Sequence, residues 1–430
     1  MGFNMTGGLP DILHIYKVIL LGYWWIYLPL ALFFILRWFW LDYIRKEYLK
    51  SLEWVLLEIN FPREAVKSPK AMEQIFSGLH VVERKLKFKD KYIKGEFPTW
   101  FSLEIVGDGG MIRIFIRTPN KYRNLVESQI YAQYPEAEIN ETDDYIGNLP
   151  AGIPSKDYDL WGTEIILIQS DAYPITTYPF FFQEKEIEER TDPIAGLFEF
   201  LSSLLPQEHV WIQILISPTN DDWKKEGEKV VSKILGKEVK SSKGQLLIVK
   251  EATGWLNALI DGVLAFFTGP SEEKKTEEKK VENLVAYLSP GQKDVVSAIE
   301  ANIAKLGLRV MIREMYWAHK DVFSKDKTAA VGGFFKQFNT QNLNGFKPNK
   351  LVTTGRGRVF KKRREPGQKR YIVKLYKSRR FLFHKPGRGF IFNTEELATV
   401  FHVPLKYVKI GRIPRIEAKK GGPPSKLPTV

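Results

Sequence analysis

Cysteine is absent from the 430-residue sequence, which excludes disulfide bonds, thiolate metal ligands and cysteine nucleophiles. Histidine is scarce. The six residues stand far apart, at positions 14, 80, 209, 319, 384 and 402, without a second histidine or a carboxylate at the spacing of a zinc site. We therefore expect neither a metal centre nor a bound cofactor.

Motifs for nucleotide chemistry are missing as well. No GxxxxGK[ST] pattern occurs, and two glycine-bearing stretches, GDGG at 107–110 and GRGR at 355–358, lack the Lys-Ser/Thr pair that meets nucleotide phosphates and magnesium. Paired acids such as Asp143 and Asp144 stand where turns and helix starts favour carboxylates. The sequence also shows no nucleophilic side chain and general base arranged as in a catalytic site. We therefore expect a protein that is not itself an enzyme.

One long apolar run is present, over residues 18–36, which carry no charge. A helix rises about 1.5 Å per residue, so this run covers roughly the 30 Å hydrocarbon core of a bilayer. Bulky aromatics continue through Trp40, where a signal peptide would carry small residues at a cleavage site. We predict an uncleaved transmembrane anchor over 18–44 after an N-terminal tail, 1–17. A buried core helix is the alternative.

The charges that flank this run predict its orientation. Lys17 is the only basic residue before it, whereas Arg37, Arg45, Lys46 and Lys50 follow closely. Basic residues concentrate on the cytoplasmic side of membrane spans. The sequence thus predicts a single-pass protein of the inner membrane with its large C-terminal part in the cytoplasm.

The chain after the anchor has the pattern of an α+β protein, with a first α/β domain over 52–150. Ser68 and Pro69 suit the N-cap and first position of a helix, and the glycine-rich turn suits a hairpin. The predicted order is strand, helix, two strands, helix, strand, at residues 54–59, 68–79, 100–106, 111–117, 120–134 and 137–140. This order is that of a ferredoxin-like sandwich.

A second sandwich in tandem is predicted over 158–345. Residues 112–120 (IRIFIRTPN) and 211–220 (WIQILISPTN) share an alternating strand pattern that ends near a proline, which suggests a repeat. Ser289 and Pro290 then suit the start of a further helix, followed by a strand.

An apolar and charged insertion, 250–283, interrupts the second domain. Its apolar part, 255–267, is too short to span a bilayer. It suits either a helix on a membrane or partner surface or a core helix.

Positive charge gathers near the C-terminus, in a basic aromatic segment over 346–390. Within it, residues 356–388 hold fourteen Lys and Arg and a single acid, Glu365. Lys and Arg neutralise phosphates, while interleaved aromatic rings stack on unpaired bases. The candidate contacts are Arg356, Arg358, Lys361, Lys362, Arg363, Arg364, Lys369, Arg370, Arg379 and Arg380.

Two other interpretations of this basic segment stay open. Residues 371–376 (YIVKLY) have a strand-like pattern, and basic residues on an exposed sheet edge guard against aggregation. Attraction to anionic lipid is the other interpretation, since the chain is expected at a membrane. The sequence alone leaves DNA, RNA and lipid as possible ligands.

Several strings are distinctive: GYWWIYLPL in the anchor, YIRKEYLKSLEWVLLEINFP after it, SPKAMEQIFSGLH at 68–80, IRTPNKYRNLVESQIYAQYPEAEI at 116–139, FNTEELATVFHVP at 392–404, and IEAKKGGPPSKLP from 416. Together they resemble a bacterial family of membrane-anchored proteins associated with type IV secretion and conjugative DNA transfer. The resemblance covers both ends and the first domain, and little of 230–345. In that family, similar regions precede a hexameric P-loop motor.

The resemblance implies a non-enzymatic, membrane-anchored component of a DNA-translocation machine that organises or docks a P-loop motor ATPase. We expect that motor on a separate chain or in a missing C-terminal domain, and homo-oligomerisation by analogy with ring-shaped motors. The alternative is a stand-alone membrane-surface protein that binds RNA or anionic lipid without a motor.

The last segment, 391–430, combines a short helix with a Pro/Gly/Lys tail. Asn393 or Thr394 suits the helix N-cap. The helix either packs on the second sandwich or docks the motor or the next subunit. Candidate docking residues are Glu395, Glu396, Leu397 and Phe401.

Overall fold

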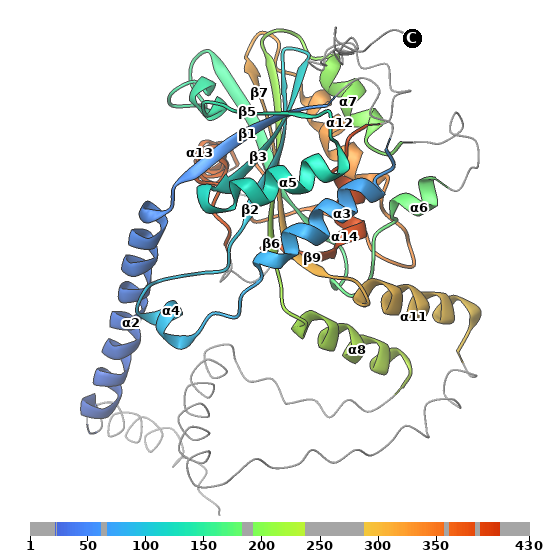
Figure 1. Cartoon of the computed structure of the whole chain (residues 1–430). Helices are drawn as coiled ribbons and strands as arrows, with labels where there is room; N and C mark the ends of the chain where they lie inside the picture. Colours follow the sequence, from blue (N-terminus) through green and yellow to red (C-terminus); the bar gives the residue numbers. More distant parts are fainter. Residues whose placement is uncertain are drawn as a thin grey trace, which may run out of the picture.

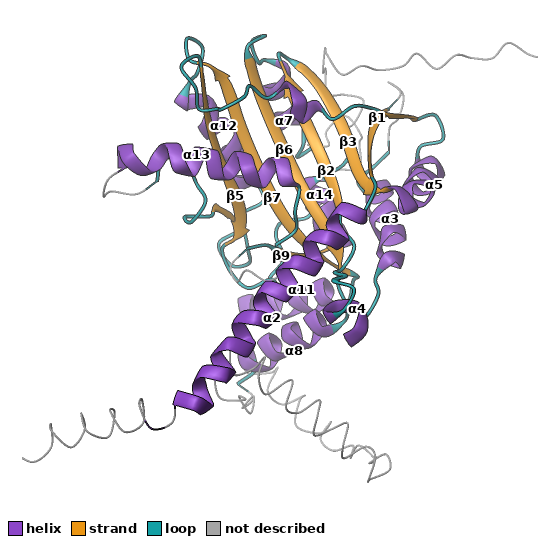
Figure 2. Ribbon diagram, turned by 90° about the vertical axis from the view of Figure 1, so that its left-hand side faces the viewer, coloured by secondary structure: helices purple, strands orange, loops and turns teal. Residues whose placement is uncertain are grey.

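The computed structural model describes residues 22, 24–61, 67–182, 192–236, 288–356, 361–382 and 388–404. A single antiparallel sheet of nine strands organises this part of the chain, with helices on both faces (Figures 1 and 2). The strand order is β4-β1-β3-β2-β6-β7-β5-β8, and β9 pairs with β7. The expected α+β class is therefore confirmed.

The first half of the sheet follows the predicted order of elements. These are β1 (Trp54–Asn60), α3 (Lys70–Leu79), β2 (Phe101–Asp108), β3 (Met111–Pro119), α5 (Arg123–Gln133) and β4 (Glu138–Glu141). A short helix, α4 (Phe88–Tyr92), lies between α3 and β2. The four strands are arranged in the order β4-β1-β3-β2.

The second half repeats this arrangement. Its elements are β5 (Tyr158–Leu167), α6 (Tyr178–Phe181), α7 (Ala195–Ser202), β6 (Glu208–Pro218), β7 (Gly307–His319), α12 (Lys325–Lys336) and β8 (Phe346–Pro348). Two more helices, α8 (Asp222–Ile234) and α11 (Pro290–Ile303), lie between β6 and β7 in the sequence. The order β8-β5-β7-β6 matches that of the first half, strand for strand.

The two halves are joined through their second strands, so the two units that were predicted in tandem share one continuous sheet. Antiparallel pairing of β2 with β6 places Phe101 opposite Ile216 and Asp108 opposite His209. Both strands are buried along almost their whole length, so neither is an edge strand. The similar strings at 112–120 and 211–220 fall on β3 and β6, which occupy different positions in their halves.

Most of the hydrophobic core lies between one face of the sheet and the helices that cover it. Leu57, Leu103, Ile214 and Ile312 project from four strands into one buried cluster, which α3, α5, α7 and α12 complete. The predicted capping of α11 is confirmed, because Ser289 and Gln292 form a capping box with Pro290 at the start of the helix. The opposite face of the sheet carries more polar side chains and is covered by one long helix, α13 (Lys361–Ser378).

Helix α2 (Trp24–Ser51) projects away from the sheet at its N-terminal end (Figure 1). In the part of the chain that the structure describes, no helix is long and apolar enough to cross a membrane, so the predicted transmembrane helix is not supported. Residues 18–21 and 23 of the predicted anchor lie outside the described residues. The described part still exposes large apolar side chains, among them Trp25 at 61% and Leu36 at 69%.

Other predicted segments fall wholly or largely outside the described residues. They are the tail 1–17, the insertion 250–283 and residues 405–430. The last two elements of the described part of the chain are β9 (Phe390–Asn393) and α14 (Thr394–Val400).

Candidate functional site

The basic segment forms a helix across the polar face of the sheet, where Figure 2 shows α13 running over β5, β7 and β6. The strand-like interpretation of 371–376 is therefore wrong. Ile372, Val373, Leu375 and Tyr376 are buried together, because this spacing places them on one side of a helix. Gly162 on β5 makes room for the helix, since a Cβ atom there would lie 3.0 Å from Ile372 Cγ1.

The C-terminal end of α13 is held by side chains from the sheet. Arg313 on β7 donates to the carbonyl oxygens of Leu375 (3.2 Å) and Arg380 (2.9 Å), and Gln213 on β6 donates to that of Tyr376 (3.2 Å). The last carbonyls of a helix lack partners within the helix and carry its negative partial charge. A buried guanidinium is therefore well suited to cap this end.

Arg379 forms the strongest link between this segment and the first half of the sheet. Its Nε and Nη2 atoms donate to the two carboxylate oxygens of Glu104 at 2.7 and 2.8 Å, and Nη2 also donates to Asp144 at 3.0 Å. Burial by itself raises the pKa of Glu104, but the Arg379 guanidinium and the hydrogen bonds bring that pKa below its ordinary value. The carboxylate is thus charged and fully paired inside the protein.

A second buried ion pair joins β7 to β5 beside the C-terminal end of α13. Arg313 Nε donates to Glu164 Oε1 at 3.1 Å, and Arg388 also pairs with Glu164. Near the other end of the helix, the Lys369 ammonium lies 2.7 Å from Asp159 and 2.9 Å from Glu365. Ionic and hydrogen-bonded contacts therefore fix α13 to the sheet on both sides of the central strands.

The outer side of α13 carries cations that do not pair with any described acid. Arg363, Arg370, Lys374 and Lys377 are exposed and spaced seven, four and three residues apart, which aligns them in one stripe. Lys362 and Arg364 are also exposed beside them. We call these six residues the basic stripe. Its side chains are available to an anionic ligand, while the helix beneath them is rigidly held.

The structure separates the predicted contact residues into exposed and internal groups. Lys362, Arg363, Arg364 and Arg370 belong to the basic stripe, and Arg356 is exposed next to the carbonyl of Pro348. In contrast, Lys369 and Arg379 are buried in ion pairs, and Arg380 is only partly exposed. Arg358 and the side chain of Lys361 lie outside the described residues.

Two members of the stripe, Lys374 and Lys377, were missed by the sequence prediction. A helical period applied to YIVKLYKS would have placed both on the side opposite to Ile372 and Tyr376.

The predicted docking helix α14 is part of the core. Leu397 is fully buried and Phe401 is 3% exposed, with its ring centroid 6.4 Å from that of Phe76 on α3. Glu396 forms a capping box with Asn393, and burial raises its pKa to about 8. Glu395 pairs with Lys305. The side chains proposed for docking thus stabilise the fold, and the helix packs on α3 of the first half as well as on the second half, where the packed-helix alternative had placed it.

Histidine and carboxylate side chains do meet inside the protein, but in pairs. His402 Nε2 lies 2.9 Å from Asp192 Oδ1, and His209 Nδ1 lies 2.8 Å from Asp108 Oδ1 while its ring stacks on Trp317. Among the described residues, no group of three or more His, Asp and Glu side chains is placed to hold a metal ion. The basic stripe is therefore the main candidate functional site on the sheet.

Comparison with known proteins gives one family. No curated protein matches the sequence significantly. A family model described as a domain of unknown function, DUF8128, matches residues 42–411. The match begins within α2 and includes the complete sheet, the basic stripe and α14. Because it covers most of the sequence, the chain belongs to the DUF8128 family.

Proposed function

We propose that this protein is a non-enzymatic, membrane-attached scaffold that holds nucleic acid, most simply DNA, against the basic stripe of α13. The observation that carries the proposal is the stripe itself, six exposed cations without a described acidic partner on a helix that is held on the sheet by the Lys369–Asp159 pair and, just after its end, by Arg379. A surface that is rigid before binding loses little conformational entropy when a ligand binds.

The length of the stripe suits an extended polyanion. From Arg363 to Lys377 it extends about 21 Å at 1.5 Å per residue. Each strand of double-stranded DNA carries one phosphate per about 3.4 Å of the duplex axis, so the stripe matches the length of roughly six base pairs. Cations at this spacing contact the backbone of DNA without reading its sequence.

Membrane attachment is proposed through α2 and the apolar residues before it. Its support is the exposure of Trp24, Leu32, Leu36 and Trp38, each more than half exposed along one helix. Large apolar patches of this kind are rare on the surfaces of monomeric soluble proteins. The span over 18–44, its orientation and the placement of the sheet in the cytoplasm follow from the flanking charges and belong to the same proposal.

The assembly role is proposed from the sequence resemblance alone. On that basis, the scaffold would organise a P-loop motor of a type IV secretion or conjugation-like machine, and it would do so as a homo-oligomer by analogy with ring-shaped motors. We also propose that the two halves of the sheet are copies of one ferredoxin-like unit, which is supported by their identical strand order.

The test of the basic stripe compares two sets of four substitutions in the full-length protein. Arg363, Arg370, Lys374 and Lys377 are changed to Gln, and a control variant has the same change at four exposed lysines of α8, Lys224, Lys225, Lys229 and Lys233. Binding to duplex DNA is measured by fluorescence anisotropy over a range of salt concentrations.

The logarithm of the binding constant falls linearly with the logarithm of the salt concentration, and each neutralised phosphate adds about 0.9 to the magnitude of this slope. We expect the stripe variant to lose two to four such contacts, which would reduce the slope by about 2 to 3.5, while the α8 variant keeps the original slope. Equal slopes for the stripe variant and the unmodified protein would overturn the proposed interface.

A further inference from the structure

The segment from Glu83 to Thr99 docks on α2 and carries helix α4 with it. Trp40 Nε1 donates to the carbonyl oxygen of Tyr92 at 3.0 Å, and the rings of Tyr48 and Phe97 are 5.0 Å apart. Gly95 has a φ of +70°, and a Cβ atom there would lie 2.6 Å from the backbone carbonyl of Ile44. This close approach, which requires glycine, fixes α4 beside the exposed apolar helix.

Two acids of this segment, Asp90 and Glu96, are neutralised internally. Arg84 lies 3.2 Å from Asp90 and 2.6 Å from Glu96, while Lys94 lies 2.9 Å from Asp90. The hydrogen bond from Lys94 lowers the pKa of Asp90 below its ordinary value. Four lysines remain that pair with no described acid: Lys85, Lys87, Lys89 and Lys91.

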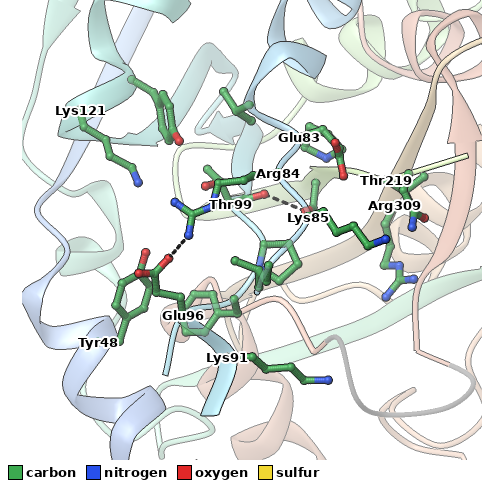
Figure 3. A pocket seen from close by; sticks show the side chains of 18 residues that line it. Tyr48, Glu83, Arg84, Lys85, Lys91, Glu96, Thr99, Lys121, Thr219 and Arg309 are labelled. Carbon is green, nitrogen blue, oxygen red and sulfur yellow. Dashed lines mark hydrogen bonds and ion pairs between the residues drawn. The ribbon is translucent and has the colours of Figure 1, made fainter. Parts of the chain in front are cut away.

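Beside these lysines is a cavity of about 390 Å³, bounded by α2, the docked segment, the start of α5 and the adjoining ends of β6 and β7. Figure 3 shows Lys121 and Arg84 on one side of it and Lys85 and Arg309 on the other. Thr99 and Thr219 add polar groups to the lining. The volume falls within the range of about 300–1,000 Å³ that is common for small-ligand sites.

The docked segment also exposes apolar side chains. Ile93 is 57% exposed and Phe88 is 58% exposed, and both belong to the segment that carries the unpaired lysines. Exposed apolar side chains among lysines are typical of elements that lie in the interface of an anionic membrane. The same segment contacts α2 at Trp40 and Arg37, next to the most exposed apolar part of that helix.

We propose that this cavity binds the phosphate head group of an anionic phospholipid, with Lys85, Lys121 and Arg309 as its cationic ligands. Ile93 and Phe88 enter the adjoining apolar boundary of the same leaflet. The inference rests on the proposed membrane attachment, because that attachment brings the cavity to the level of the head groups. Cations near an anionic leaflet each strengthen the attraction to it, so three cations at the cavity favour an anionic head group over a zwitterionic one.

The test uses the full-length protein in detergent micelles and short-chain lipids as probes. Binding of dioctanoyl phosphatidylglycerol, dioctanoyl phosphatidylcholine and inorganic phosphate is measured by native mass spectrometry and isothermal titration. The variant changes Lys85, Lys121 and Arg309 to Gln. The control changes Lys224, Lys229 and Lys233 on α8 to Gln, which removes the same number of charges at a distance from the cavity.

We expect the unmodified protein to bind phosphatidylglycerol at least tenfold more tightly than phosphatidylcholine, and the cavity variant to lose at least tenfold in that affinity. The α8 variant should bind as the unmodified protein does. Lys121→Gln alone provides a second measurement if the triple variant fails to fold, because Lys121 is exposed and its loss should still weaken binding several-fold.

Three results would overturn the lipid site. They are equal binding of the two lipids, an unchanged affinity in the cavity variants, and binding of inorganic phosphate as tight as that of phosphatidylglycerol, which would identify a free phosphate as the ligand. Extraction of native membranes with alkaline carbonate tests attachment separately. Release of the protein by carbonate would contradict membrane attachment, whereas retention together with unchanged lipid binding in the variants would contradict the cavity site alone.

Discussion

Replacement of Arg379 by methionine tests whether buried ion pairs hold α13 on the sheet. Arg379 is 1% exposed and Glu104 is fully buried, so the substitution leaves a carboxylate inside the protein without its cation. Breaking a buried pair in this way costs about 3–5 kcal/mol. Glu104 keeps hydrogen bonds from Tyr145 and Gln213, and we therefore expect the lower part of this range.

The pH dependence of this loss follows from the two protonation states. In the unmodified protein the pKa of Glu104 is lowered, so its contribution to stability is present above the unfolded pKa and disappears as pH falls. Without Arg379, burial raises the pKa of Glu104 and the variant loses stability as pH rises. The difference between the two proteins should therefore grow from pH 4.5 to pH 7, by up to about 1.4 kcal/mol per pH unit.

Urea denaturation at several pH values, followed by tryptophan fluorescence, measures this difference. Adding Glu104→Gln to the Arg379→Met variant should recover part of the loss at pH 7, because the unpaired charge is removed. The positive φ of Arg379, 43°, is retained by methionine and does not contribute. A loss below about 1 kcal/mol that does not vary with pH would refute the assignment of this pair as the main link, since a broken buried pair costs several times more.

Two further predictions concern buried polar groups. Burial raises the pKa of Glu314 on β7 to about 8, and neither carboxylate oxygen has a described hydrogen-bond partner, so the folded state favours the protonated form and loses stability as pH rises from about 4.5 to 8. Glu314→Leu should remove this dependence, so that the stability of the variant relative to the unmodified protein is greater at pH 9 than at pH 5 in urea titrations; parallel pH profiles of the two proteins would contradict it. Asn393→Ala removes the N-cap of α14 and should cost about 1–2 kcal/mol. An unchanged urea midpoint would show that the cap contributes nothing.

The elements whose signals are local were predicted well from the sequence. The Gly109-Gly110 turn between β2 and β3 and the start of α11 at Ser289 and Pro290 were recognised because the residues that form them are adjacent in the chain. Backbone conformation at such positions depends mainly on the residues themselves, which is why these signals are reliable.

The joining of the two halves could not be predicted in the same way. Pairing of Leu103 with Ile214 brings together residues more than a hundred positions apart, and both strands have ordinary apolar patterns. The five apolar or aromatic residues in YIVKLYKS are also too few to distinguish a strand from a helix by period.

The internal ion pairs were hidden for a related reason. Arg379, Lys369 and Glu104 are of residue types that usually lie on the surface, and nothing in the sequence marks them as buried. Charged side chains are almost never fully buried unless they are paired. The sequence does not show the pairs, so the residue types alone predicted a position on the surface. Lys85, Lys87 and Lys89, in and before α4, are the opposite case, since they are exposed but were overlooked among the more strongly basic residues near the C-terminus.

The seam between β2 and β6 has a consequence for the symmetry of the protein. Two separate copies of one four-stranded unit, paired through their second strands, would form a dimer with a two-fold axis, and every charge near that axis would occur twice. A single chain is free of that restriction. Here Glu104 lies opposite Gln213, so the centre of the seam holds one carboxylate and can be neutralised by one arginine from a segment that crosses only one face. Fusion of the halves thus permits an asymmetric face on a nearly symmetric sheet, and that face carries α13.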